Sequence, residues 1–87
     1  MSYRLKIEGR AKKDLQALDT VTQRRIAKKL KFFLDQPDPL EHAKKLVDAA
    51  AGTYRWRIGP YRIIFDAEGK TIRLLRVQHR REVYRRR

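Results

Sequence analysis

The feature that most constrains this fold is a hairpin pattern in residues 54–65. Aromatic and β-branched residues alternate with arginines on both sides of a Gly-Pro pair, which predicts two antiparallel strands joined by a two-residue turn. This register sets Arg57 opposite Arg62 and Trp56 opposite Ile63. The hairpin is therefore expected to have one apolar face and one arginine-rich face.

Alternation along the two strands assigns every side chain to a face. The apolar face, expected to form the core, consists of Tyr54, Trp56, Ile58, Tyr61, Ile63 and Phe65. The opposite face, called here the arginine face, carries Arg55, Arg57 and Arg62. Like charges that oppose each other across a sheet are destabilising. We therefore expect an anion to bind where these arginines converge.

The flanking segments predict an α+β domain in the order β-α-α-β-β-β. Alternation from Tyr3 to Glu8 indicates a half-buried first strand. Two amphipathic helices follow; the first ends near Asp19, and Thr20 with Gln23 forms a capping-box pattern that starts the second. We expect these helices to form a hairpin on the aromatic face of a small, curved, mainly antiparallel sheet.

The rest of the chain is predicted to form a loop, a last strand and a basic tail. Residues 40–52 lack a clear period and are expected to form a loop that exposes Lys44 and Lys45. A turn at residues 67–70 precedes the last strand. Alternation then places on the arginine face Arg73, Leu75, Val77 and His79. No linker or repeat divides residues 1–87, so they are interpreted as a single domain.

The charge points to a polyanionic partner. Lys and Arg number 23 against 10 Asp and Glu, a formal net charge of +13. Nucleic acid is the first candidate, ahead of an acidic protein or an anionic membrane surface. The chain has no cysteine and no apolar run near the ~20 residues of a membrane span. Without the apolar segment of a secretory signal, the expected protein is soluble and cytoplasmic, with no membrane partner.

The residue types suit RNA cleavage without a metal or cofactor. Two histidines and scattered carboxylates make no metal cluster, and there is no glycine-rich phosphate loop. Guanidinium groups bind phosphate oxygens in pairs and stabilise developing charge. Histidine titrates near neutrality, and nearby cations favour the ionised form of a phenol, so His79 and Tyr84 are both candidates for proton transfer. The phosphate-binding and catalytic candidates are Lys44, Lys45, Arg55, Arg57, Arg62, Arg73, His79, Arg80, Arg81 and Tyr84.

Nearly the whole chain resembles the RelE/ParE superfamily of bacterial and archaeal toxins from type II toxin–antitoxin systems. The similar segments are residues 10–15, Lys45-Leu46, the hairpin at 54–65 and the closing stretch 76–84. The combination of the hairpin with a His-Arg-x-x-x-Tyr ending is the specific part of the likeness.

The resemblance implies a RelE-like fold and an endoribonuclease that cuts messenger RNA in the A site of the 70S ribosome. In RelE-like members two basic residues of the second strand contact RNA, and Arg55 and Arg57 match them. Arg62 matches the arginine that supports the scissile phosphate, and Arg80 matches the arginine after the last strand. Tyr84 matches the terminal tyrosine proposed for proton transfer.

The resemblance also implies a cognate antitoxin, in a heterodimer or heterotetramer, through which alone the toxin would meet operator DNA. A disordered acidic chain that folds on binding suits a surface with this charge. We expect it to cover the arginine face or to hold the C-terminal tail away from it.

This sequence departs from the RelE pattern in two ways that leave alternatives open. Both second-strand basic residues are arginine rather than lysine. The spacing from Arg80 to Tyr84 is shorter than in some RelE members, so His79 stays open as the base. ParE-like toxins share the fold but inhibit DNA gyrase without the nuclease residues. The third hypothesis for the function is a non-enzymatic basic RNA-binding module.

Overall fold

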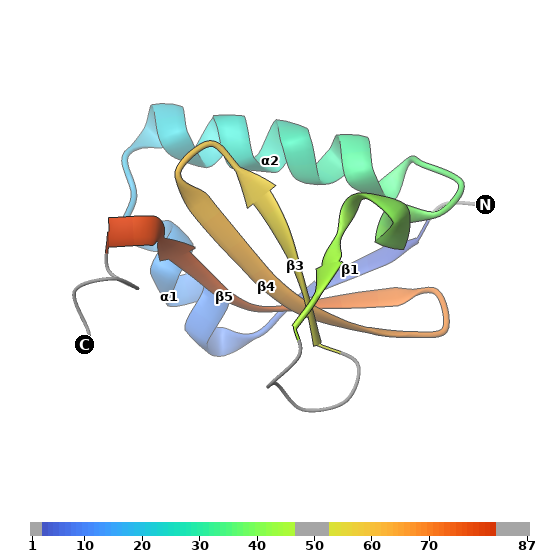
Figure 1. The fold of residues 1–87 in the computed structure, drawn as a ribbon. Helices are drawn as coiled ribbons and strands as arrows, with labels where there is room; N and C mark the ends of the chain where they lie inside the picture. Colours follow the sequence, from blue (N-terminus) through green and yellow to red (C-terminus); the bar gives the residue numbers. More distant parts are fainter. Residues whose placement is uncertain (1–2, 47–52, 82–87) are drawn as a thin grey trace.

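The computed structural model describes residues 3–46 and 53–81, which form a five-stranded sheet with two α-helices on one face (Figure 1). The elements in chain order are β1 (Arg4–Ile7), α1 (Gly9–Gln16), α2 (Thr20–Leu34), the 3₁₀ helix η1 (Pro39–His42), β2 (Lys44–Lys45), β3 (Thr53–Ile58), β4 (Tyr61–Glu68) and β5 (Thr71–His79). The sheet order is β1-β5-β4-β3-β2, with β1 parallel to β5 and the other neighbours antiparallel. The predicted α+β class is confirmed. No helix within the described ranges is long and apolar enough to cross a membrane.

The β3–β4 hairpin has the register that the sequence predicted. Ile58 pairs with Tyr61 at the turn. Arg57 pairs with Arg62 in the next position. Gly59 has a φ of +57°, which glycine adopts without steric cost and which a type II′ turn requires at its first loop position. The turn therefore holds the two arginines directly opposite each other.

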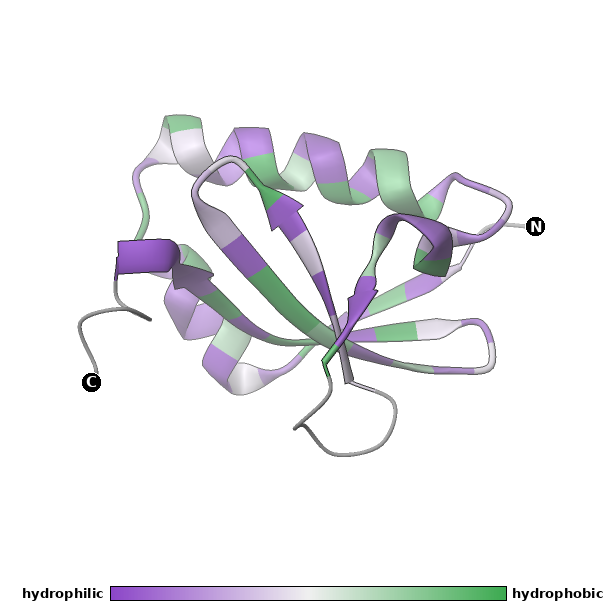
Figure 2. Cartoon of the chain, in the orientation of Figure 1, coloured by the Kyte–Doolittle hydropathy of each residue, from purple (hydrophilic) through white to green (hydrophobic). Residues whose placement is uncertain are grey.

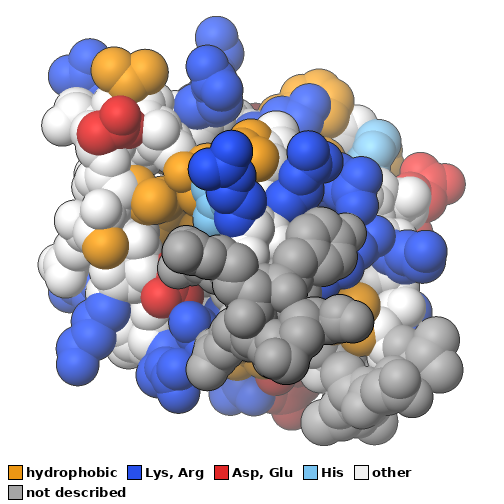
Figure 3. All heavy atoms as spheres, turned by 60° about the vertical axis from the view of Figure 1, so that its left-hand side comes forward, with side chains coloured by type: hydrophobic (Ala, Val, Ile, Leu, Met, Phe, Trp, Pro, Cys, Tyr) orange, Lys and Arg blue, Asp and Glu red, His pale blue; other side chains and the backbone are white. Residues whose placement is uncertain are grey.

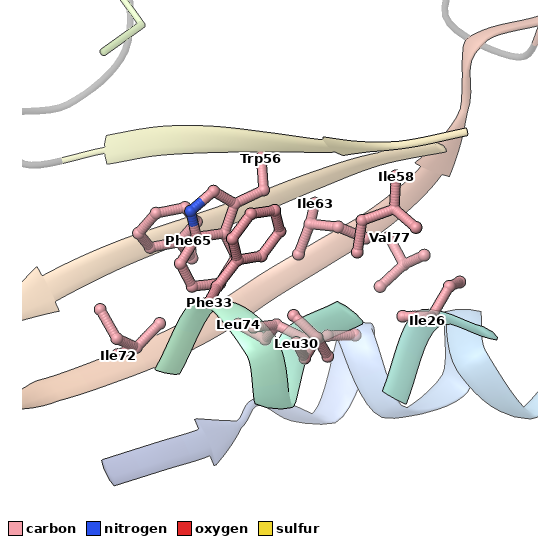
Figure 4. Packing of buried hydrophobic residues seen from close by; sticks show 11 residues of the cluster. Ile26, Leu30, Phe33, Trp56, Ile58, Ile63, Phe65, Ile72, Leu74 and Val77 are labelled. Atoms are coloured by element: carbon pink, nitrogen blue, oxygen red, sulfur yellow. The ribbon is translucent and has the colours of Figure 1, made fainter. Parts of the chain in front are cut away.

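The aromatic face of the hairpin forms one wall of the core and α2 forms the other (Figure 4). Trp56 stacks on Phe33 of α2 with ring centroids 4.7 Å apart and on Phe65 of β4 at 4.0 Å. Its indole N–H donates to the carbonyl oxygen of Pro39 at 3.2 Å, so the buried polar atom has a partner. The buried apolar side chains are Ala11, Ile26, Leu30, Phe33, Trp56, Ile58, Ile63, Phe65, Ile72, Leu74 and Val77. Strongly hydrophilic residues recur at every second position in the middle of β3, whereas β4 has a continuous hydrophobic stretch at residues 63–65 (Figure 2).

β5 departs from simple alternation because a β-bulge interrupts its pairing with β4. Phe65 pairs with Leu74, but the next pair along the ladder is Ile64 with Arg76, so β5 contains one extra residue. Every side chain beyond the bulge changes face. Val77 is therefore in the core at 5% exposure, and the prediction that it lies on the arginine face was wrong.

The start of α2 also differs from the prediction. Asp19 is the N-cap, and its side chain accepts a hydrogen bond of 2.8 Å from the backbone N–H of Thr22. The capping box predicted one residue later was wrong, because aspartate supplies a negative charge that a helix N-terminus favours. The Gln23 side chain instead donates to the carbonyl oxygens of Leu15 at 2.9 Å and Leu18 at 2.8 Å. It thereby ties the end of α1 to α2.

Residues 40–52 are not the continuous loop that was predicted. Their described part includes most of η1 and the edge strand β2, which pairs with residues 54–55 of β3. Two residues are too few to show an alternating pattern, so periodicity did not indicate this strand. The two lysines of β2 are exposed, as predicted. Residues 47–52 lie outside the described residues.

Asp14 joins α1 to β5 beside the bulge. Its carboxylate accepts hydrogen bonds from Arg76 Nε at 2.9 Å and from the backbone N–H of Val77 at 2.8 Å. Partial burial disfavours the charged carboxylate, but these hydrogen bonds and the charges of Arg76 and Arg10 outweigh it. Together they hold the pKa of Asp14 below its ordinary value.

Replacing Asp14 with alanine should lower the free energy of unfolding by about 1–3 kcal/mol at pH 7, because Val77 and Arg76 lose their acceptor. The folded pKa of Asp14 is depressed, so its contribution is present above the unfolded pKa of about 3.9 and is lost as the pH falls through the folded pKa. Urea unfolding at pH 7 and at stepwise lower pH should show that the free energies of unfolding of the wild type and of Asp14→Ala become equal as the pH falls. Glu41→Ala, which removes an exposed carboxylate, is the control; equal stability of both variants at pH 7 would contradict this role.

Candidate functional site

Arginines from three segments border one small cavity at the tip of the β3–β4 hairpin. The cavity, called here the arginine cavity, has a volume of about 170 Å³. The residues that line it are Arg57, Gly59, Pro60, Tyr61, Arg62 and Arg80. Lys and Arg side chains predominate on the molecular face that Figure 3 presents, which is the left-hand side of Figure 1 brought forward.

Strand pairing and one backbone hydrogen bond position the three arginines. Arg57 and Arg62 are a directly opposed pair on neighbouring strands, so they share a face. Arg80 follows β5, which runs beside β4 to the end of the hairpin. Its backbone N–H donates to the carbonyl oxygen of Pro60 at 2.8 Å, which holds the start of the tail against the turn.

No carboxylate among the described residues neutralises these arginines. The ion pairs in the described ranges join β4 to β5 and α1 to β5, and neither includes an arginine of the cavity. Arg62 is half-buried, whereas Arg57 and Arg80 are exposed. Guanidinium groups that converge without an acidic partner repel one another, and an anion between them relieves that repulsion. The planar fork of arginine matches the oxygens of a phosphate.

Several predicted phosphate-binding residues do not line the arginine cavity. Arg55 is half-buried and pairs with Lys44 of β2, so both belong to the arginine face. Lys45 and Arg81 are exposed. None of these residues borders the cavity, and their contact with RNA stays a prediction.

Arg73 is held in an ion pair away from the cavity. Its Nε lies 3.1 Å from Asp66 Oδ1 and its Nη2 lies 3.1 Å from Asp66 Oδ2. The hydrogen bonds and charge of Asp66 raise the pKa of Arg73. Gln78 of β5 pairs with Arg62, and Arg73 lies five residues away from Gln78 along the same strand. At the usual rise per residue this separation is about 16 Å. Its role in phosphate binding also stays a prediction.

His79 lies on the face of the sheet that the helices cover. It pairs with Tyr61, whose ring it meets edge-on with centroids 5.1 Å apart. Together with Asp14 and Leu18 it borders a second cavity of about 410 Å³. Its Nδ1 accepts a hydrogen bond of 3.0 Å from the backbone N–H of Arg81. The prediction that His79 shares the arginine face was wrong, because the bulge in β5 reverses the alternation.

One site residue was not predicted from the sequence, and one predicted residue lies outside the described part of the chain. Tyr61, interpreted from sequence as a core residue only, is half-buried and borders both cavities. Its position directly after the Gly-Pro turn was the signal that could have placed it there. Tyr84 lies outside the described residues. Within the described ranges no three His, Asp or Glu side chains gather as metal ligands would.

Comparison with known proteins identifies sequence relatives over almost the whole chain. A family model described as the ParE toxin of type II toxin–antitoxin systems, parDE, matches residues 5–84. Toxin RelG of Mycobacterium tuberculosis is 34% identical over 90 residues, which cover 99% of this chain and 100% of RelG.

Solved structures have the same fold. The RelE–RelB complex of the archaeon Pyrococcus horikoshii matches with a TM-score of 0.72 and 31% identity, covering 92% of this chain and 97% of the other. The toxin–antitoxin complex RelBE2 of Mycobacterium tuberculosis matches with a TM-score of 0.71 and 29% identity, covering 91% and 92%. Both were solved as complexes.

Inorganic phosphate should stabilise the protein through the arginine cavity. Above the dissociation constant, each tenfold rise in phosphate should add about 1.4 kcal/mol to the free energy of unfolding, because the ligand binds only the folded state. Thermal unfolding at constant ionic strength measures the effect. Arg62→Ala should lose most of it, and Arg4→Ala, which removes an exposed arginine from β1, should retain it. Equal stabilisation of the two variants would contradict a phosphate site at this cavity.

Proposed function

The chain belongs to the RelE/ParE superfamily of toxins from type II toxin–antitoxin systems, and on that premise we propose that it is a RelE-like endonuclease of messenger RNA. The observation that carries the proposal is the arginine cavity, where Arg57, Arg62 and Arg80 converge without a carboxylate from the described residues. The substrate is message bound in the A site of the ribosome. The proposed action is therefore cytoplasmic.

The proposed chemistry uses the 2′-hydroxyl of the RNA as the nucleophile. Its oxygen bonds to the adjacent phosphorus and the bond from phosphorus to the 5′-oxygen breaks, which leaves a 2′,3′-cyclic phosphate and a 5′-hydroxyl. One protein group takes the proton of the 2′-hydroxyl and another protonates the leaving oxygen. Arg57, Arg62 and Arg80 bind the phosphate and stabilise the charge that develops on its oxygens.

We assign the role of the base, which takes the proton of the 2′-hydroxyl, to Tyr84 rather than to His79. His79 borders the cavity beside α1 and not the arginine cavity, and its Nδ1 already accepts a hydrogen bond from Arg81. Tyr84 matches the terminal tyrosine of RelE-like toxins, although its spacing from Arg80 is shorter than in some of them.

Inhibition of DNA gyrase is the second candidate function. The family model favours it, since its description names ParE toxins. A gyrase inhibitor acts by binding a protein and has no need of a phosphate cavity, so the arginine cavity argues for the nuclease. The two functions differ in what they damage first, message or DNA.

The proposed partner is a cognate antitoxin, which we place in an apolar groove between β1 and α2 instead of on the arginine face or the C-terminal tail that the sequence suggests. The groove has a volume of about 610 Å³ and is lined by residues that include Leu5, Ile7 and Leu34. Two exposed cations, Arg24 and Lys31, border the same groove together with one exposed carboxylate, that of Asp35. Apolar walls with cations at the edge suit an amphipathic segment of an acidic chain. Both similar structures described above are complexes with an antitoxin, which supports the proposal.

Arg62→Ala should lower cleavage of translated message by about 10²–10³-fold, the usual loss when one preorganised donor to developing charge is removed. Primer extension on message translated in vitro measures the cleavage, with Arg4→Ala as the control. Tyr84→Phe should be similarly impaired, whereas His79→Gln should retain activity.

Full toxicity of Arg62→Ala, Arg80→Ala and Tyr84→Phe would show that the catalytic assignment is wrong. Intact message together with DNA damage during growth arrest would favour gyrase as the target. Salt-dependent RNA binding without any cleavage would favour a non-enzymatic binding module.

Ala27→Glu should weaken binding of the antitoxin by at least about tenfold, because it places a charge in the apolar groove facing an acidic partner. Ala27 is exposed and borders the groove, so the folded toxin should tolerate the change. Isothermal titration measures the affinity, and Val21→Glu, at an exposed position of α2 outside the groove lining, is the control. Equal affinities of the two variants would place the antitoxin elsewhere.

A further inference from the structure

The helix α2 carries a second stripe beside its apolar one. Arg25, Lys28, Lys29 and Phe32 follow the spacing i, i+3, i+4, i+7, so they share one face of the helix. All four are exposed, Phe32 with 47% of its surface. Like charges three and four residues apart destabilise a helix. An anionic ligand on this stripe would relieve the repulsion, as at the arginine cavity.

The stripe borders a cleft that adjoins the arginine cavity. The cleft has a volume of about 580 Å³ and lies between α2 and the tip of the β3–β4 hairpin. Its lining residues are Arg25, Lys28, Lys29, Phe32, Arg57, Ile58 and Gly59. Arg57 and Gly59 also line the arginine cavity, so the two hollows meet across the hairpin tip. Among the described residues no acidic side chain lines either one.

Phe32 gives this cleft an exposed aromatic ring among cations. Its neighbour Phe33 is buried and stacks on Trp56, so the core does not require a second phenylalanine here. The ring of Phe32 meets that of Phe33 edge-on at 5.9 Å, and Lys29 Nζ lies 4.8 Å from its centroid. Aromatic rings that stack on bases, set among cations that follow the backbone, are typical of single-stranded nucleic-acid binding.

We propose that the cleft binds a nucleotide next to the scissile phosphate, with its base stacked on Phe32 and the RNA backbone beside Arg25, Lys28 and Lys29. The inference rests on the proposed nuclease function and extends its substrate site from the hairpin onto α2. Arg57, at the junction of the two hollows, then contacts the strand between them. Stacking accepts any base, so Phe32 positions the strand and does not select its sequence.

An acidic peptide is the competing occupant, and two observations favour RNA. The aromatic ring lies among the cations rather than in a separate apolar groove. The cleft also shares Arg57 and Gly59 with the cavity that the proposed function gives to the scissile phosphate. An amphipathic peptide already has a proposed site in the groove between β1 and α2, on the other side of the same helix.

The test is fluorescence anisotropy with a labelled 2′-O-methyl oligonucleotide of about 12 residues, a length within the range that single-stranded binding proteins cover. The 2′-O-methyl groups remove the nucleophile, so the probe stays intact. Phe32→Leu, which keeps an apolar contact with Phe33, should weaken binding about tenfold, and Phe32→Trp should restore it. For Lys28→Gln, the slope of the logarithm of the binding constant against the logarithm of the salt concentration should be smaller in magnitude by about one. Lys12→Gln removes the same charge from an exposed position of α1 outside the lining of both hollows and should bind as the wild type does.

The outcomes separate this inference from the proposed function. If Phe32→Leu and Lys28→Gln bind like Lys12→Gln while Arg57→Ala binds more weakly, the cleft inference is overturned and the nuclease proposal stands. If Arg57→Ala also binds like the wild type, both are overturned. If Phe32→Leu loses affinity for the antitoxin and keeps it for RNA, the cleft belongs to an acidic protein and the inference is overturned.

Discussion

Burial of Trp56 between Phe33 and Phe65 is the interaction on which the arrangement of charge depends. Side chains on a strand alternate between faces, so a buried Trp56 turns Arg57 outward. The pairing of β3 with β4 then sets Arg62 directly opposite. Core packing thus supplies the free energy that holds two guanidinium groups together against their repulsion.

Among the described residues, two groups of cations differ in what surrounds them. Arg73 and Arg76 pair with carboxylates and join β5 to its neighbours, so they serve the fold. The cations at the arginine cavity and along the stripe of α2 have no carboxylate lining their hollows among the described residues. Both hollows meet at Arg57, so a single extended anion can bind to the two of them. A polynucleotide strand is an extended anion of this kind, so the proposed function and the inference from α2 support each other.

The bulge in β5 decides which residues can take part in chemistry together. It turns Val77 into the core and His79 toward α1, and the carboxylate of Asp14 binds the backbone beside it. The strand still reaches the end of the hairpin, where the backbone of Arg80 bonds to Pro60. The consecutive residues His79 and Arg80 therefore line different cavities, and only Arg80 lines the same cavity as Arg57.

The sequence by itself determined the α+β class, the register of the β3–β4 hairpin and the convergence of Arg57 with Arg62, because each follows from local periodicity and from the glycine that the turn needs. The likeness to RelE-like toxins also identifies Arg80 as a site residue. Only the tertiary structure decided that Arg80 borders the cavity, that His79 does not, and that the stripe of α2 adjoins Arg57. A single extra residue in a strand reverses its alternation without any local signal. Contact between a helix face and a hairpin tip depends on how the whole core packs, which no short window of sequence encodes.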